Sequence, residues 1–193
     1  MAKIKTLFIC LLWIIIPFYS YSVSSYDYDC IIYNSTEHID ITEKGGNNKG
    51  FSDPLFEKQM RAVGWKPSMA WCSFLVKLWL TQCNIPHTIT GWSPTSYNKN
   101  DVIYTDGEFK QPYFKNDILV MSLSYDKFKN VKSRYKGIGH TGLVKEIGTH
   151  SVITIEGNTN DLGTRDSRTG DGVYQKRRPL NKKIHITRWG KRS

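Results

Sequence analysis

One predicted β-hairpin decides the fold, and its residues 140–156 read HTGLVKEIGTHSVITIE. Two runs rich in β-branched residues flank a short loop that contains a glycine, which is typical of paired antiparallel strands. If the loop is the three residues 147–149, counting outward in pairs sets His140 opposite Glu156. Directly opposed side chains have Cβ atoms about 4.5–5.5 Å apart, so the carboxylate is expected to hold the imidazole in one orientation. A two-residue loop would shift this register by one residue and make the pairing diagonal.

The other predicted elements favour an α+β domain. Asp53 and Pro54 are typical of a helix start, and apolar spacing continues that helix to Gly64. A second helix is expected from Pro67–Ser68 to about Gln82, because apolar residues recur there every three or four positions. Further strands are expected at 118–121, 173–177 and 183–188. We therefore expect N-terminal helices that pack on a central antiparallel sheet.

Positive charge is concentrated at the C-terminal end of the chain. The 193 residues include 27 Lys and Arg against 17 Asp and Glu, and 39% are hydrophobic, which excludes a disordered or collagen-like chain. Residues 176–193 contain eight bases and no acid, whereas residues 23–175 are balanced. Such a basic end either is simply solvated or meets an anionic partner, and charge alone does not distinguish nucleic acid, a membrane and a cell wall.

The N-terminus predicts export. Residues 1–22 combine Lys3 and Lys5, ten apolar residues and then serines, as a secretory signal does, and cleavage after Ser22 or after Ser24 fits equally well. The signal would contact the membrane only transiently, and the mature protein would be periplasmic or extracellular, which argues against nucleic acid as a partner. Residues 23–42 are expected to be a leader, and residues 43–193 one domain.

Cys72 is the candidate nucleophile. It falls near the start of the second predicted helix, where backbone N–H groups and the helix dipole favour a thiolate. A thiolate needs an imidazole nearby to accept and return a proton, and His140 with Glu156 would supply one. Asn158 lies two residues beyond Glu156 and is expected to serve the ring or an oxyanion. Most cysteines and tryptophans on an apolar helix are core residues. The nucleophile hypothesis therefore depends on Cys72, His140 and Glu156 occurring together.

Three segments together resemble the CHAP-type peptidoglycan hydrolases, relatives of the NlpC-type and papain-like cysteine peptidases. They are WCSFLV (71–76), GHTGLV (139–144) and IEGNT (155–159). The upstream loop 43–50 and the later GDGVY (170–174) and KRRP (176–179) are also similar to that family. The resemblance spans about residues 43–189.

The resemblance implies a papain-like fold and a cysteine amidase or endopeptidase that cleaves peptidoglycan through a thioacyl intermediate. It implies Cys72 as nucleophile, His140 as general base and acid, Glu156 as the residue that orients the histidine, and Asn158 as a further polar residue of the site. No cofactor and no metal are expected. Tryptophans that would line a substrate groove are Trp65, Trp71 and Trp92.

Two departures from the family pattern occur. The strand before the histidine usually opens with Pro-Gly-Asp, and here only Asp117 of that motif remains. A glycine or proline commonly leads into Trp-Cys, and here Ser68-Met-Ala70 stands instead. The first change is expected to alter the rim of the cleft.

Two alternatives stay open. The chain is also consistent with a catalytically inactive, exported module of the same fold that binds a cell wall or a protein. A disulfide between Cys72 and Cys83 would make Cys72 structural, and one of the three cysteines outside the signal segment is left unpaired in any case. Neither the bond that is cut, nor whether the target is the producer's wall or another cell's, nor the oligomeric state follows from the sequence.

Overall fold

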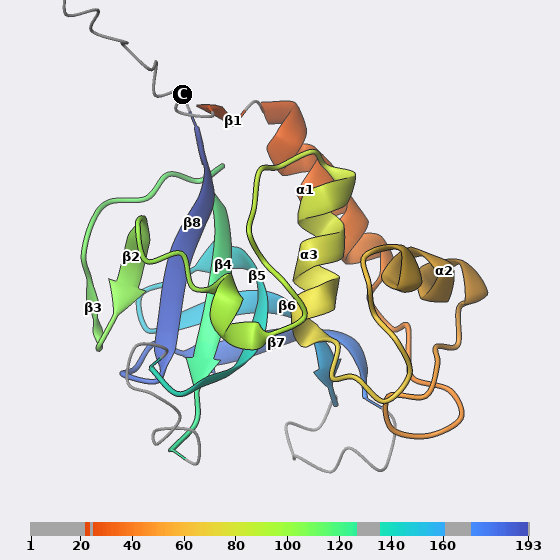
Figure 1. Cartoon of the computed structure of the whole chain (residues 1–193). Helices are drawn as coiled ribbons and strands as arrows, with labels where there is room; N and C mark the ends of the chain where they lie inside the picture. Colours follow the sequence, from red (N-terminus) through yellow and green to blue (C-terminus); the bar gives the residue numbers. More distant parts are fainter. Residues whose placement is uncertain (1–21, 24, 127–135, 161–170, 193) are drawn as a thin grey trace, which may run out of the picture.

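The computed structural model describes residues 22–23, 25–126, 136–160 and 171–192. Three helices lie on one side of a curved sheet (Figure 1). Their bounds are α1 Ser25–Glu37, α2 Pro54–Ala62 and α3 Cys72–Gln82. The predicted α+β architecture, with N-terminal helices packed on an antiparallel sheet, is therefore confirmed.

The sheet contains seven antiparallel strands in the order β3-β2-β8-β4-β5-β6-β7, and β1 pairs with β8 in parallel. The strands are β1 Ser22–Val23, β2 Val102–Thr105, β3 Glu108–Phe109, β4 Ile118–Ser124, β5 Ile138–Ile147, β6 Ser151–Thr159, β7 Gly172–Pro179 and β8 Ile184–Arg192. A short 3-10 helix, η1 (Ser93–Ser96), lies between α3 and the sheet in the chain order. The strands predicted around 118–121, 140–156, 173–177 and 183–188 are all present.

Local chemistry explains where the helices start. Asp53 Oδ1 accepts hydrogen bonds from the N–H groups of Leu55 and Phe56 at 2.7 and 3.0 Å, so α2 begins with a side-chain cap followed by Pro54. The prediction that the next helix begins at Pro67–Ser68 is wrong. Ser68 has a φ of 75°, which a helix does not allow, and α3 begins at Cys72.

The residues between the signal segment and position 43 form more structure than expected. Residues 25–37 make the 13-residue helix α1, and Ile31 on it is buried in the main core. The sequence did not predict this helix, because its apolar and polar residues are mixed without a clear helical period. Only part of the helix surface packs against α3.

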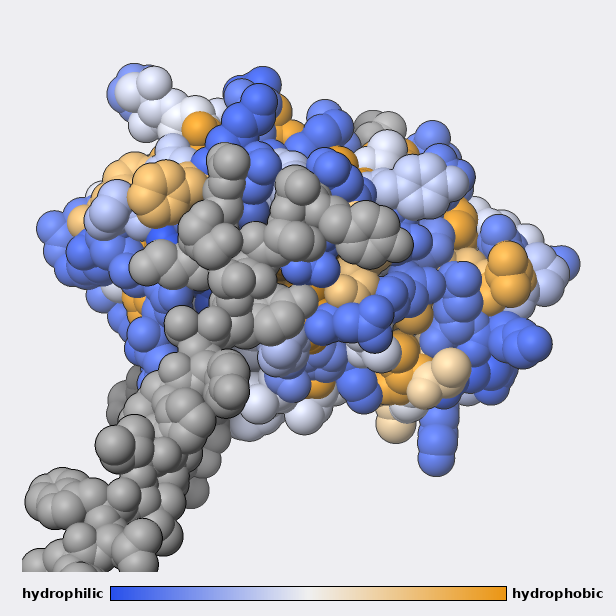
Figure 2. All heavy atoms as spheres, turned by 90° about the horizontal axis from the view of Figure 1, so that it is seen from above, coloured by the Kyte–Doolittle hydropathy of each residue, from blue (hydrophilic) through white to orange (hydrophobic). Residues whose placement is uncertain are grey.

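Two apolar clusters hold the layers together. The larger one joins the helices to one face of the sheet and includes Trp79, Val120 and Leu143. The smaller one lies on the opposite face and includes Met121 and Val144, as expected from the alternation of side chains along a strand. Seen from above in Figure 2, the surface is largely hydrophilic, with hydrophobic side chains in small groups.

The β5–β6 hairpin has a different register from the predicted one. Leu143 pairs with Ile155 and Ile147 with Val152, and a bulge falls between Val144 and Glu146. The turn is therefore displaced toward β6, and His140 is not directly opposite Glu156. The diagonal relation of these two residues still brings their side chains together, as described below.

The basic C-terminal end is part of the sheet. Strand β8 lies between β2 and β4, so residues 184–192 form an inner strand and not a removable tail. The Arg188 side chain is buried, and its Nε lies 2.9 Å from Oδ2 of Asp117, the residue before β4. Part of the terminal charge is thus neutralised inside the protein.

A disulfide links Cys30 of α1 to Cys83, the residue after α3, with a Cα–Cα distance of 5.9 Å. Cys72 is a free, buried cysteine. The alternative Cys72–Cys83 pairing is therefore wrong. Residues 1–21 of the expected signal segment lie outside the described residues, and within the described part no helix has the length and apolar character to cross a membrane.

We predict that replacing both Cys30 and Cys83 by serine lowers the free energy of unfolding by about 3–4 kcal/mol, because the bridge closes a loop of 53 residues. Denaturant unfolding of the full chain measures this change. The matched control is Cys72→Ser, which removes the free thiol and leaves the disulfide intact. Equal midpoints for the double variant and the wild type, both without reductant, would contradict the assigned pairing.

Candidate active site

Cys72 is the first residue of α3. Trp71 occupies the N-cap position and makes no side-chain capping hydrogen bond, so the first backbone N–H groups of the helix keep their capacity to face an anion. The Cys72 side chain is 4% exposed, and its Sγ lies 3.4 Å from Oγ of Ser93 in η1. The later helix start therefore places the thiol at the helix end itself, as the nucleophile hypothesis requires.

His140 on β5 and Glu156 on β6 form a hydrogen-bonded ion pair. The His140 Nε2–Glu156 Oε2 distance is 2.8 Å, and both residues are buried. If the hairpin register is continued by one residue, Gly142 stands beside Glu156, and a Cβ on Gly142 would lie 2.5 Å from Glu156 Cγ. A glycine at this position leaves the space through which the carboxylate reaches the histidine diagonally.

Glu156 is completely buried and accepts hydrogen bonds from three side chains. Besides His140, Thr154 Oγ1 donates to Oε1 at 2.5 Å, and Arg178 donates from Nε to Oε1 at 2.9 Å and from Nη2 to Oε2 at 2.6 Å. Burial raises the pKa of Glu156, but the Arg178 and His140 hydrogen bonds outweigh it and hold the pKa far below its usual range. The carboxylate is therefore ionised at any physiological pH.

The thiol and the imidazole stabilise each other's charged forms. Burial alone raises the pKa of Cys72, yet the charge and hydrogen bonding of His140 outweigh it, so the thiol pKa lies below its ordinary value. Burial likewise lowers the pKa of His140, and Cys72 together with Glu156 moves it well above its ordinary value. Both directions favour a thiolate–imidazolium pair at neutral pH. With Nε2 bound to Glu156, Nδ1 is the nitrogen left to exchange a proton with Cys72.

Two other groups near the thiol were not predicted from the sequence. The Ser93 hydroxyl and the backbone of Thr141 both lower the Cys72 pKa by hydrogen bonding. The loop that carries Ser93 is held against the start of α3, because Ser73 Oγ donates to the carbonyl of Thr90 at 2.7 Å. Its glycine, Gly91, packs on Phe74 so closely that a Cβ would lie 2.1 Å from the ring. A serine at the start of a short 3-10 helix carries no sequence signal for this contact.

Asn158 lies at the site but is placed differently from the expectation. It has a φ of 57°, and in the side-chain orientation that satisfies hydrogen bonding its Oδ1 accepts from the N–H of Trp71 at 3.1 Å. Its Nδ2 then donates to Asp171 Oδ2 at 3.2 Å. Asn158 therefore supports the chain that leads into Cys72, and its assigned partners do not include the His140 ring.

The three tryptophans predicted to line a groove divide into two groups. Trp65 and Trp71 are 1% and 0% exposed, and Trp71 Nε1 donates to Glu43 Oε1 at 2.6 Å. A fully buried indole offers no surface to a ligand, so these two are core residues. Trp92 is 49% exposed and directly precedes Ser93, which keeps it as a candidate for substrate contact.

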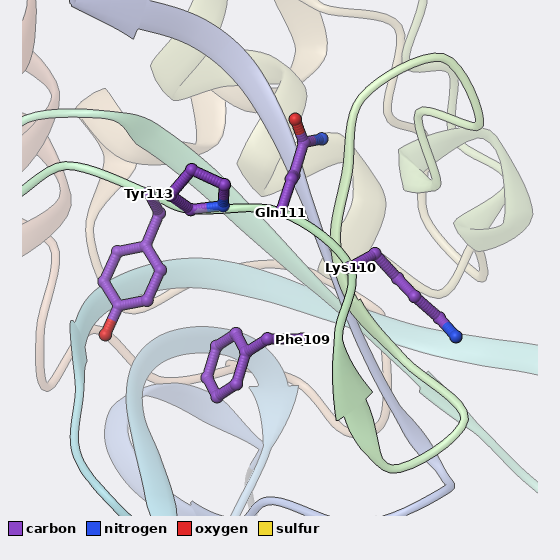
Figure 3. Close-up of a pocket in the computed structure, with 5 residues that line it drawn as sticks. Phe109, Lys110, Gln111 and Tyr113 are labelled. Carbon is purple, nitrogen blue, oxygen red and sulfur yellow. The ribbon is translucent and has the colours of Figure 1, made fainter.

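A shallow cavity lies away from this site. It has a volume of about 540 Å³ and is lined by residues 109–113, which run from the end of β3 onward, at the edge of the sheet away from α3 (Figures 1 and 3). The Phe109 and Tyr113 rings stack with centroids 5.7 Å apart, while Lys110 points away from them in Figure 3. Among the described residues, no three His, Cys, Asp or Glu side chains are grouped so that they could hold a metal.

The chain shows no significant match to any protein-family model, curated protein or solved structure.

We predict that His140→Ala lowers the rate at which iodoacetamide labels Cys72 at pH 6 by at least about tenfold. The imidazolium that favours the thiolate would be lost, while the burial that disfavours it would remain. Peptide mass mapping of the unreduced protein measures labelling at Cys72 alone. His150→Ala is the matched control, because His150 is an exposed histidine in the turn of the same hairpin. Labelling of His140→Ala at the wild-type rate would refute the ion pair.

Proposed function

We propose that this protein is an exported cysteine hydrolase of the CHAP type that cleaves amide bonds in bacterial peptidoglycan. The observation that carries the proposal is the site formed by Cys72 at a helix start, His140 and Glu156. The segment resemblance supports the substrate class, and the predicted signal segment supports export. The Cys30–Cys83 disulfide fits the same location, since disulfides are uncommon in a reducing cytosol.

A papain-like fold is part of the proposal. Such a fold combines a nucleophilic cysteine at the start of a helix with a histidine on the adjoining sheet. Here α3 contacts β5 and β6, the strands that carry His140 and Glu156 (Figure 1). The proposed papain-like fold is therefore supported by the positions of Cys72, His140 and Glu156, and not by the strand order alone.

In the acylation step, Cys72 Sγ attacks the carbonyl carbon of the amide and a C–S bond forms. The C–N bond breaks when His140 gives its proton to the leaving amine. In the second step His140 takes a proton from water, the hydroxyl oxygen bonds to the acyl carbon, and the C–S bond breaks. Glu156 keeps the ring in place through both steps, because its bond to Nε2 is maintained while Nδ1 moves the proton.

The start of α3 is the candidate site for stabilising the developing oxyanion. The Cys72 N–H lies at the end of a helix whose N-cap side chain makes no bond to it. A backbone donor of this kind is fixed before the reaction, so it gains strength as charge develops on the carbonyl oxygen. The Ser93 hydroxyl, in contact with Sγ, is a second candidate donor.

Recognition of the wall is expected to use surface charge near β7. Lys145 on β5 and Arg177 on β7, the two strands that flank β6, are exposed, and Lys182 is exposed in the turn before β8. Peptidoglycan stem peptides carry carboxylates, so these side chains would favour the approach of the polymer at low ionic strength. Trp92 at the loop beside the thiol is the candidate for a direct substrate contact.

We predict that the purified protein releases soluble fragments from peptidoglycan sacculi and that Cys72→Ala releases none. Glu156→Gln is expected to lower the rate at least about a hundredfold, since the ring would lose a charged partner. Mass spectrometry of the fragments identifies the bond: a free lactyl carboxyl on N-acetylmuramic acid together with a free L-alanine amine indicates an amidase, and a new carboxyl within the stem peptide or cross-bridge indicates an endopeptidase.

His150→Ala is the matched control for this assay and should keep wild-type activity. Binding to sacculi of several wall types without any release by the wild type would overturn the hydrolase proposal. That result would favour the inactive binding module of the same fold.

A further inference from the structure

Arg178 on β7 reaches the active site from a strand that the proposed mechanism does not use. The β6–β7 register pairs Val152 with Arg178, which places this arginine on the same sheet face as Thr154 and Glu156. Its guanidinium binds both oxygens of the Glu156 carboxylate, at 2.9 and 2.6 Å. The Arg178 side chain is 24% exposed, whereas Glu156 is 0% exposed.

An arginine is suited to this position by its shape and by its charge. Its planar fork forms two parallel hydrogen bonds to a carboxylate, which fixes the carboxylate plane as well as its distance. A buried carboxylate without a paired charge would be strongly destabilised, and the neutral Thr154 hydroxyl cannot supply that charge. Arg178 is thus the charged group that balances Glu156 when His140 is neutral.

We propose that Arg178 is a positioning residue of the hydrolase: it fixes the Glu156 carboxylate and offsets its charge, so that His140 can release its proton during turnover. The role of Arg178 in turnover rests on the proposed hydrolase function. Its effect on the proton affinity of His140 does not depend on that function. Without the guanidinium, the full negative charge of Glu156 would act on the imidazolium beside it. His140 would then hold its proton more tightly and be a poorer acid.

The charges around the pair set the expected direction. Cys72 on α3 and Asp171 before β7 act on His140 as negative charges, together with Glu156. Tyr125, which follows β4, raises the pKa of Arg178 by its charge. The titratable groups that interact with Glu156 are His140 and Arg178. Arg178 is therefore the positive group that counters these negative charges, and its removal raises the proton affinity of His140.

The test is a pH titration of the His140 ring by NMR in full-length protein labelled with ¹⁵N-histidine. At the pH where half of the wild-type His140 rings have lost their proton, we expect Arg178→Gln to raise the ratio of imidazolium to imidazole about tenfold. Arg178→Lys keeps the charge and should titrate near the wild type. The fork is lost in that variant, so its Cys72 alkylation should be slower by at least about threefold.

Arg177→Gln is the matched control, because it removes the same charge from an exposed residue whose side chain bonds Ser151 Oγ at 3.0 Å. Its His140 titration should equal that of the wild type. An unchanged titration in folded Arg178→Gln overturns the proposal, as does an equal shift in Arg177→Gln. If Arg178→Gln does not fold, Arg178→Lys decides: slower Cys72 alkylation supports the positioning role, and the wild-type rate overturns it. The readouts need no substrate, so they stand apart from the sacculus assay.

Discussion

The buried charge of Glu156 is the constraint on which the site depends. A carboxylate with no solvent contact must find charged partners and donors within the protein, and here they come from three adjacent strands. Strand β5 contributes His140, β6 contributes Thr154, and β7 contributes Arg178. The register of β5, β6 and β7 is therefore tied to the chemistry, since a slip of one residue would turn these side chains to the other face of the sheet.

The helical layer brings the nucleophile to this carboxylate-centred network. Trp71 is buried directly before Cys72, and a Cβ on Gly157 would lie 2.3 Å from its ring, so β6 and the start of α3 are in close contact. The disulfide after the other end of α3 holds that helix to α1. Both ends of α3 are thus anchored, which limits how far the thiol can move from the imidazole. A nucleophile and a base that are held together in advance need little reorganisation when a substrate arrives.

Sequence reasoning predicted α2, the main strands and the three residues that meet at the candidate site, but it missed α1, the start of α3 and the geometry that joins the site residues. Cys72, His140 and Glu156 could be predicted because residue type, helix position and hairpin pattern each pointed to one chemistry. The predicted register was wrong because the turn lies closer to β6, with Ile147 paired to Val152, and neither this turn nor the bulge near Val144 has a local sequence signature. Gly142 has no side chain and leaves the space for the diagonal contact. Arg178 was counted as part of a basic end, since nothing in one strand reveals which side chain faces a buried acid on the next.

The most direct test of the central claim is whether the Cys72 thiolate holds the proton on His140. The ¹⁵N-histidine NMR titration of the wild type is compared with that of Cys72→Ser, which keeps nearly the same volume but cannot form a thiolate. The thiolate–imidazolium pair predicts that the wild-type ring stays protonated to a higher pH than the ring in Cys72→Ser. Identical titrations of His140 in the two proteins would contradict it.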